Sequence, residues 1–186
     1  MRPIHVIPLT SGVPTGPRIE PALNLLEYLA AALARAFRTP CRIRPDIFDV
    51  SYAWDAGRNQ YYSTAILQRL DRDSDPGARI LGVTAGDLYV PVLTFVFGEA
   101  QLDGNCAAVS TARLREDFYG LPPRDDLLHE RLLKEAIHEL GHTFGLRHCS
   151  DWRCVMSSSH AVERLDVKGA EFCKACRKPV FGGRYW

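Results

Sequence analysis

The segment from His138 to His148 constrains this chain more than any other, because it reads HExxHxxGxxH. Residues four apart lie on one face of an α-helix, so His138 and His142 can bind a single metal ion. Gly145 can adopt the positive φ that ends a helix, which lets the chain turn back and bring His148 to the same ion. Three protein ligands leave one zinc position open for water, as in catalytic sites.

Glu139 follows the first histidine and is turned away from it by about a third of a revolution. It therefore flanks a metal ion and does not bind it. From that position a carboxylate can take a proton from metal-bound water, so we interpret Glu139 as a general base. The alternative is a helix with solvated histidines, but solvation does not require this spacing.

The helix that carries these residues is predicted to begin near Asp125 and Asp126, which suit an N-terminus by capping and by dipole. Apolar residues recur every three or four positions and give a stripe for the core: Leu133, Ile137, Leu140 and Phe144. Glu135, His138 and His142 fall on another face. Apolar packing is thus expected to anchor the helix while its other side carries the metal.

Composition limits the class of protein. The 186 residues are enough for one ordinary domain, and 46% hydrophobic with 24% charged residues is globular. A formal net charge of +1 without a basic block gives no case for nucleic-acid binding. No run approaches the roughly 18 apolar residues of a membrane span. The start, residues 1–9, is too short and proline-broken for a signal peptide, which favours a cytoplasmic location.

Four cysteines cluster behind the histidine motif. Cys149 and Cys154 form one pair, and Cys173 and Cys176 form a CxxC pair. Two such pairs suit a closed tetrahedral Cys₄ zinc site, which would stabilise a C-terminal part with few long apolar runs. The alternatives are two disulfides, a thioredoxin-like redox pair or a nucleic-acid-binding zinc ribbon. The redox pair lacks its strand-to-helix setting, and the ribbon lacks a basic and aromatic patch.

The two remaining cysteines, Cys41 and Cys106, stand alone in strand-like runs and are expected to be small buried residues. Free thiols together with a thiolate zinc site fit a reducing compartment. Cys149 directly follows His148, so the two proposed metal sites share a backbone segment. We expect the Cys₄ site to fix His148 and to shape the wall of the cleft.

Strand-like and helix-like segments alternate along the chain, with strands predicted at 4–9, 41–48, 80–84, 93–97 and 106–110. Helices are predicted at 21–37 and 58–70, with a possible helix at 112–118, and residues 11–17 form a Gly/Pro loop. The pattern predicts an α/β (α+β) fold with a mixed, largely parallel sheet. We expect residues 1–145 to form an N-terminal catalytic subdomain, and residues 146–186 an irregular C-terminal subdomain, within one compact domain.

The order HExxHxxGxxH-C-x4-C-x-M, followed by CxxC, resembles the archaemetzincins, metalloproteases of the metzincin clan. Segments 81–84, 87–91 and 95–100 are also similar to that family, whereas the resemblance is weak before about residue 50. Sixteen residues separate Met156 from Cys173, where about seventeen are expected. The resemblance implies a twisted mixed sheet, a catalytic zinc on the three histidines, a structural zinc on the four cysteines, and Met156 as a Met-turn beneath the histidines.

The resemblance also implies a peptide substrate, held by an edge strand above the cleft. Our candidate for that strand is 93–97 or the segment just after it. Ser158 stands where some metzincins have a tyrosine, so the oxyanion-stabilising group is unidentified. His160 is a conceivable donor but reads more readily as a surface histidine, and His5 and His129 as structural or solvated.

These observations predict a monomeric zinc metallopeptidase that binds two Zn²⁺ per chain and acts on peptides or proteins, not on nucleic acid or at membranes. Three rivals stay open: a zinc-binding module with weak or no activity, a zinc-ribbon interaction protein, and an amidohydrolase acting on a small non-peptide amide.

Overall fold

The computed structural model describes residues 1–13, 19–45, 48–73 and 75–182. Its main sheet has the strand order β2-β1-β6-β9-β8, and β3 continues beside the end of β1. The strands are β1 (Ile4–Thr10), β2 (Cys41–Ile43), β3 (Phe48–Asp49), β6 (Arg79–Thr84), β8 (Gly98–Ala100) and β9 (Cys106–Ser110). All pair in parallel except β8, which runs antiparallel to β9. The predicted mixed, largely parallel sheet is confirmed.

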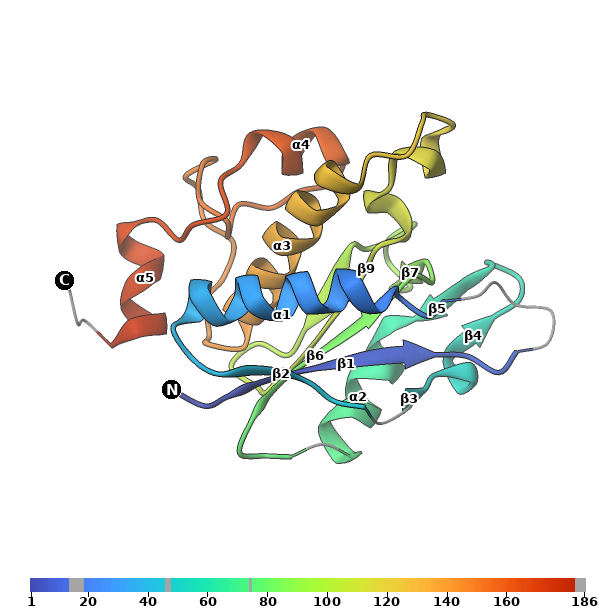
Figure 1. Cartoon of the computed structure of the whole chain (residues 1–186), viewed down its shortest axis with the longest axis horizontal. Coiled ribbons are helices and arrows are strands. Elements are labelled where there is room, and N and C mark those ends of the chain that lie inside the picture. Colours follow the sequence, from blue (N-terminus) through green and yellow to red (C-terminus); the bar gives the residue numbers. More distant parts are fainter. Residues whose placement is uncertain (14–18, 46–47, 74, 183–186) are drawn as a thin grey trace.

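Helices cover both faces of this sheet (Figure 1): α1 (Leu23–Phe37) and α3 (Asp125–His142) on one face, α2 (Ser63–Asp73) on the other. Successive residues of a strand point to opposite faces. Leu81 and Val83 of β6 accordingly join the core under α1 and α3, while Ile80 joins the core under α2. Strands buried on both faces read as continuous apolar runs, which is why β6 and β9 were recognisable in the sequence.

A small second sheet lies beside the main one and is built from β4 (Trp54–Asp55), β5 (Gln60–Tyr62) and β7 (Leu88–Tyr89). Three short 3₁₀ helices complete this half of the chain: η1 (Ser51–Ala53), η2 (Ala112–Leu114) and η3 (Glu116–Tyr119). The possible helix at 112–118 is therefore two 3₁₀ turns, separated by the extended Arg115.

The C-terminal part packs onto α3 and contains α4 (Val162–Val167) and α5 (Lys174–Phe181). Its buried residues Met156, Leu165 and Phe172 belong to the same core cluster as Leu140 of α3. Residues on both sides of position 145 thus share one core. The division into two subdomains at that position stays a prediction.

Three predicted elements differ from the structure. Residues 93–97 form no strand; only Val96 makes an isolated bridge, to Leu88, and the edge strand comes just after, at β8. Residues 60–62 pair as β5, so the second helix starts at Ser63, later than predicted. The strand predicted at 41–48 is split into β2 and β3, and residues 46–47 between them lie outside the described residues. Residues 14–17 of the predicted Gly/Pro loop also lie outside the described residues.

Among the described residues, no helix is long and apolar enough to cross a bilayer.

Candidate active site

His138 and His142 project from the last turn of α3 and face each other. Their Nε2 atoms lie 3.1 Å apart. The Nδ1 atom of His138 is 2.8 Å from the carbonyl oxygen of Val155, and that of His142 is 2.7 Å from the carbonyl oxygen of Leu146. Because a carbonyl oxygen only accepts, each Nδ1 carries the proton and each Nε2 presents a free lone pair. This orientation of ring nitrogens by backbone carbonyls is typical of metal-binding histidines.

His148 reaches the same point through the turn that follows α3. Gly145 has a φ of 79°, and its N–H donates to the carbonyl of His142 over 2.9 Å. The turn so formed brings a ring nitrogen of His148 within 4.8 Å of those of His138 and His142. Burial lowers the pKa of all three imidazoles, most strongly for His138. Three converging neutral imidazoles suit the coordination chemistry of Zn²⁺.

Glu139 is 6% exposed and lines the same cleft as His138 and His142. Burial raises its pKa well above the usual range, and the nearby carboxylate of Glu135 adds to the effect. Gly98 of β8 lies so close that an added Cβ would be 2.6 Å from Glu139 Cγ. The sheet edge and the acid are therefore in direct contact.

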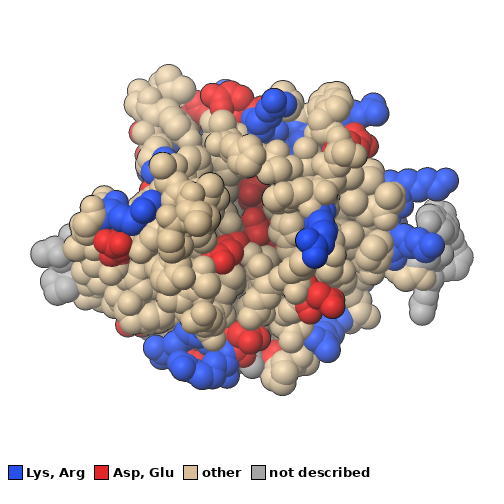
Figure 2. Space-filling model, turned by 180° about the vertical axis from the view of Figure 1, so that it is seen from behind, with Lys and Arg blue, Asp and Glu red and all other residues tan. Residues whose placement is uncertain are grey.

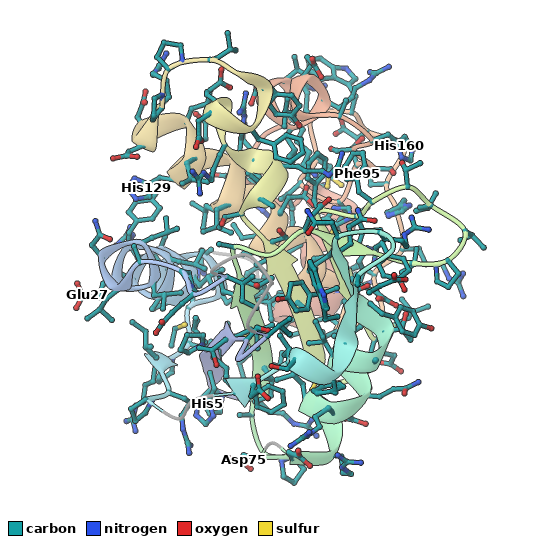
Figure 3. All side chains as sticks on the ribbon, turned by 90° about the vertical axis from the view of Figure 1, so that its right-hand side faces the viewer. His5, Glu27, Asp75, Phe95, His129 and His160 are labelled. Atoms are coloured by element: carbon teal, nitrogen blue, oxygen red, sulfur yellow. The ribbon has the colours of Figure 1, made fainter. Side chains whose placement is uncertain are left out.

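The cleft above these residues has a volume of about 540 Å³. Figure 2 shows a hollow on this side of the molecule with acidic atoms in its floor, and the acidic residues of the cleft are Glu99, Glu135 and Glu139. One wall is formed by residues 93–100, with Leu102, and the other by Arg147 and residues 158–160. The labelled side chains of Phe95 and His160 lie near each other in Figure 3 and belong to these two walls.

His160 is exposed and also lines the cleft, and its Nε2 is 3.4 Å from Ser158 Oγ. His5 and His129 lie away from the cleft in Figure 3, and the ring of His129 packs on Tyr28 with centroids 4.4 Å apart. Leu102 and Arg147 also line the cleft and were not identified from the sequence. Leu102 lies outside every motif, and Arg147 occupies an unspecified position of the HExxHxxGxxH segment, next to His148.

A buried ion pair next to the site was also not identified from the sequence. The Nζ atom of Lys168 lies 3.0 Å from Oε1 of Glu135 and 3.1 Å from the carbonyl oxygen of Ser157. The side chains of Lys168 and Glu135 are 1% and 5% exposed. The pair thus connects the metal helix, one turn before Glu139, to the segment just after Met156.

Met156 is fully buried beneath α3, and its thioether lies against Gly141. The residue therefore packs against the helix that carries His138 and His142, and its assignment as a Met-turn stays a prediction. The preceding residue, Val155, supplies the carbonyl that orients His138. The carbonyl of Met156 itself accepts a hydrogen bond from the N–H of Cys149 over 2.9 Å.

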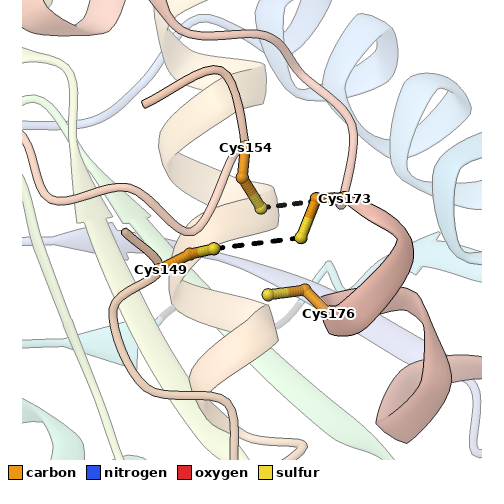
Figure 4. Close-up of side chains that lie close together, drawn as sticks. All are labelled: Cys149, Cys154, Cys173 and Cys176. Atoms are coloured by element: carbon orange, nitrogen blue, oxygen red, sulfur yellow. Dashed lines mark hydrogen bonds between the residues drawn. The ribbon is translucent and has the colours of Figure 1, made fainter. Parts of the chain in front are cut away.

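The four cysteines of the second cluster converge between residues 149–154 and the start of α5 (Figure 4). All four sulfur atoms lie within 4.8 Å of one another, and all six cysteines of the chain are free. Backbone N–H groups of α5, first that of Cys176, lower the pKa of Cys173 to about 7, whereas burial raises the pKa of Cys154 and Cys176. A thiolate at a helix N-terminus among three further thiols fits a tetrahedral zinc site.

The isolated cysteines behave as small apolar residues. Cys106 is 1% exposed and Cys41 is partly buried, and burial raises the pKa of each thiol to about 12.

The fold and these two clusters define a class of protein, the zinc-dependent metallopeptidases with a long histidine motif on the metal helix. A sequence model of Peptidase family M54 matches residues 51–180. The archaemetzincin of Methanocaldococcus jannaschii is 47% identical over 157 residues, which cover 84% of this chain and 86% of that protein.

Solved structures agree with the sequence comparison. The crystal structure of archaemetzincin from Archaeoglobus fulgidus, complexed with malonate, superposes with a TM-score of 0.78 at 36% identity, covering 95% of this chain and 99% of that one. A zinc-dependent peptidase from Methanocorpusculum labreanum gives a TM-score of 0.81 at 33% identity, again over 95% and 99% of the two chains. The chain belongs to peptidase family M54, the archaemetzincins, and is a zinc metalloprotease.

Proposed function

We propose that this chain hydrolyses peptide bonds with Glu139 as general base and with zinc held by His138, His142 and His148. The observation that carries the proposal is the convergence of three imidazoles, two of them oriented by backbone carbonyls, beside a buried carboxylate. A zinc ion bound there would act as a Lewis acid and would lower the pKa of a bound water toward about 7.

Glu139 lies where it would take the proton of that water and pass it to the leaving amine. Burial, with the nearby carboxylate of Glu135, raises the pKa of its carboxyl group. Residues 93–100 and 158–160 flank the site and leave an open cleft of about 540 Å³. Ser158 and His160 are two of the polar side chains on the other wall, and neither has an assigned role in the reaction.

The substrate is expected to pair with the outer edge of β8. This strand is the last of the main sheet and pairs only with β9 among the described strands, so its other edge is available. Its residues line the cleft beside Glu139. Backbone pairing at an exposed edge gives affinity without side-chain specificity, so the proposal names peptides as a class and no particular sequence.

We infer that a second zinc ion is held by Cys149, Cys154, Cys173 and Cys176, which gives two Zn²⁺ per chain. The role of this ion is structural, because four thiolates close a tetrahedral site and leave no position for substrate. A thiolate site and free thiols also support the proposed cytoplasmic location. We expect the working unit to be a monomer.

The decisive experiment is a peptide-library digest with product mapping, comparing the wild type with Glu139→Gln, with metal content measured on both. The proposal expects two zinc ions in each protein and cleavage only by the wild type. Cleavage retained by Glu139→Gln would refute the role of the base. Two zinc ions with no cleavage by the wild type would favour an inactive zinc-binding module. One zinc ion per chain would favour a simpler interaction module. Turnover of small amides but not of peptides would favour an amidohydrolase.

A further inference from the structure

A second cavity lies outside the catalytic cleft, on the far side of the turn that links α3 to His148. Its volume is about 730 Å³. The end of α1, the start of β6, the loop between β8 and β9, residues 143–144 and the end of α5 all contribute to it. Figure 1 shows the end of α1, α5 and the first residues of the chain at the same end of the molecule.

Positive charge predominates in this cavity. Three arginines line it, Arg2, Arg38 and Arg79, against one acidic residue, Asp103. Among the described residues, none of the three arginines forms an ion pair. Eight other arginines among the described residues have a carboxylate partner, as Arg131 does with Glu116 and Asp166. In the cavity, Asp103 is the one acidic residue and acts on Arg79 only through its charge, so the three arginines carry a net positive charge there.

Arg79 is held rigidly with one side of its guanidinium unused. Its Nη1 donates to the carbonyl oxygen of Gly104 over 3.1 Å, and to the carbonyl oxygen and Oγ1 of Thr143 over 2.6 and 2.8 Å. Nε is buried without a hydrogen-bond partner, and Nη2 has none among the described residues. Because Nε is closed off from the cavity, Nη2 is the group of Arg79 that can donate to an oxygen of a carboxylate or a phosphate there.

Aromatic and apolar groups surround this guanidinium group. The guanidinium carbon of Arg79 lies 3.6 Å from the centroid of Phe144, and that of Arg38 lies 5.6 Å from the centroid of Phe181. Pro179 and Val180 of α5 add further apolar surface to the same wall. Stacking fixes the guanidinium plane, and the apolar wall offers contact to a ligand larger than a bare ion.

We propose that this cavity binds a small organic anion, whose carboxylate or phosphate group meets Nη2 of Arg79 and whose apolar body lies against Phe144 and Phe181. Arg38 and Arg2 supply long-range attraction from the rim, where both side chains are exposed. Burial and the charge of Arg2 lower the pKa of Arg79, so a bound anion relieves an electrostatic cost already present in the folded chain.

The test uses the zinc-loaded protein with acetohydroxamate saturating the catalytic zinc, so that the anionic probes cannot bind there. Benzoate, phenyl phosphate and inorganic phosphate are titrated while the Nε–Hε signal of Arg79 is followed by NMR. The proposal expects saturable shifts of this signal with benzoate or phenyl phosphate, at least tenfold tighter than with inorganic phosphate. The two aromatic probes decide which anionic group is preferred.

Variants decide whether the cavity is responsible. Arg79→Gln is expected to weaken binding at least tenfold, and Arg38→Glu to weaken it about threefold or more. Arg72→Glu, an exposed arginine on α2, makes the same charge change as Arg38→Glu and should leave binding unaltered. If Arg79→Gln does not fold, Arg38→Glu and its control suffice. Binding that is equal in Arg38→Glu and Arg72→Glu, or no saturable shift with either aromatic probe, would overturn the proposal.

Discussion

The thioether of Met156 lies directly against Gly141, the residue before His142 on the metal helix. A Cβ at position 141 would overlap the Met156 sulfur atom and would lie 3.2 Å from a ring carbon of Phe172. Glycine within a helix costs roughly 1 kcal/mol relative to alanine, so its presence here needs a tertiary reason. That reason is the close approach of the floor of the zinc site to the helix backbone.

Gly141→Ala is therefore expected to destabilise the protein by about 1–3 kcal/mol, although helix propensity alone predicts the opposite sign. The side chain of Met156 would have to move, and with it the segment whose Val155 carbonyl orients His138. Urea denaturation gives the free energy of unfolding, and metal analysis gives the retention of zinc.

The control is a double-mutant cycle with Met156→Ala. If the overlap with Met156 is the cause, Gly141→Ala should cost much less free energy in the Met156→Ala background than in the wild type. An equal cost in both backgrounds would mean that Gly141 is needed for some other reason.

Lys168→Met is expected to be more damaging, at about 3–5 kcal/mol, because it leaves the buried carboxylate of Glu135 without its cation. The double variant Lys168→Met with Glu135→Gln should recover much of this loss, since no uncompensated charge then stays buried. Thermal and urea unfolding of the four proteins measure the coupling. Additive losses would show that the two side chains act independently.

Cys173→Ser is expected to lower the zinc content from two ions per chain to one and also to reduce peptidase activity. The physical reason is the shared backbone: Cys149 follows His148 directly, and its N–H is bound to the carbonyl of Met156. Loss of the Cys₄ site should therefore loosen the third histidine.

Cys41→Ser is the matched control, because Cys41 is a lone, partly buried thiol outside the cluster. It should keep both zinc ions and full activity. Full activity in Cys173→Ser with one zinc ion lost would show that the two metal sites are uncoupled.

Glu139→Gln is expected to stabilise the protein at neutral pH once the histidine-site metal has been removed by a chelator. The folded-state pKa of Glu139 is raised well above the usual 4.5, so the folded wild type holds a proton that the unfolded chain releases. The wild type therefore loses stability, relative to the variant, as pH rises from 4.5 toward the raised pKa. The slope is at most about 1.4 kcal/mol per pH unit.

Chemical denaturation of both proteins between pH 4 and pH 8 measures this difference. Below the usual pKa both side chains are neutral, and the two stabilities should converge. Glu27→Gln, at an exposed position of α1 that points away from the molecule in Figure 3, controls for the removal of one acidic residue. A difference between wild type and Glu139→Gln that does not change with pH would contradict the burial of an ionisable group.

The metal clusters were predictable because their geometry is mostly local. His138 and His142 share a helix face by spacing alone, and Gly145 indicated the turn that the structure shows at a φ of 79°. The cysteine pairs likewise carry the spacing of a zinc site within short segments. The buried strands β6 and β9 were found because strands covered on both faces are continuously apolar.

Residues 93–97 show where this reasoning fails. Their apolar, β-branched and aromatic content favours a strand, but the pairing partner β9 takes Gly98–Ala100 instead. Register along a sheet is decided by the whole strand and by its neighbours, and here Gly98 is needed where the backbone meets Glu139. Local strand propensity contains no information on that contact, because Gly98 and Glu139 are far apart in the sequence.

The sequence by itself determined the chemistry of this protein: three histidines, a glutamate and four thiols at spacings that a helix, a turn and two short loops convert into metal sites. Only the tertiary structure decided what surrounds them. The pairing of Lys168 with Glu135, the contact of Met156 with Gly141 and the hydrogen bonds of Arg79 to Thr143 each join segments far apart in the chain. Such contacts depend on how helices, strands and loops pack against one another, and they cannot be predicted from the spacing of residues within a short segment.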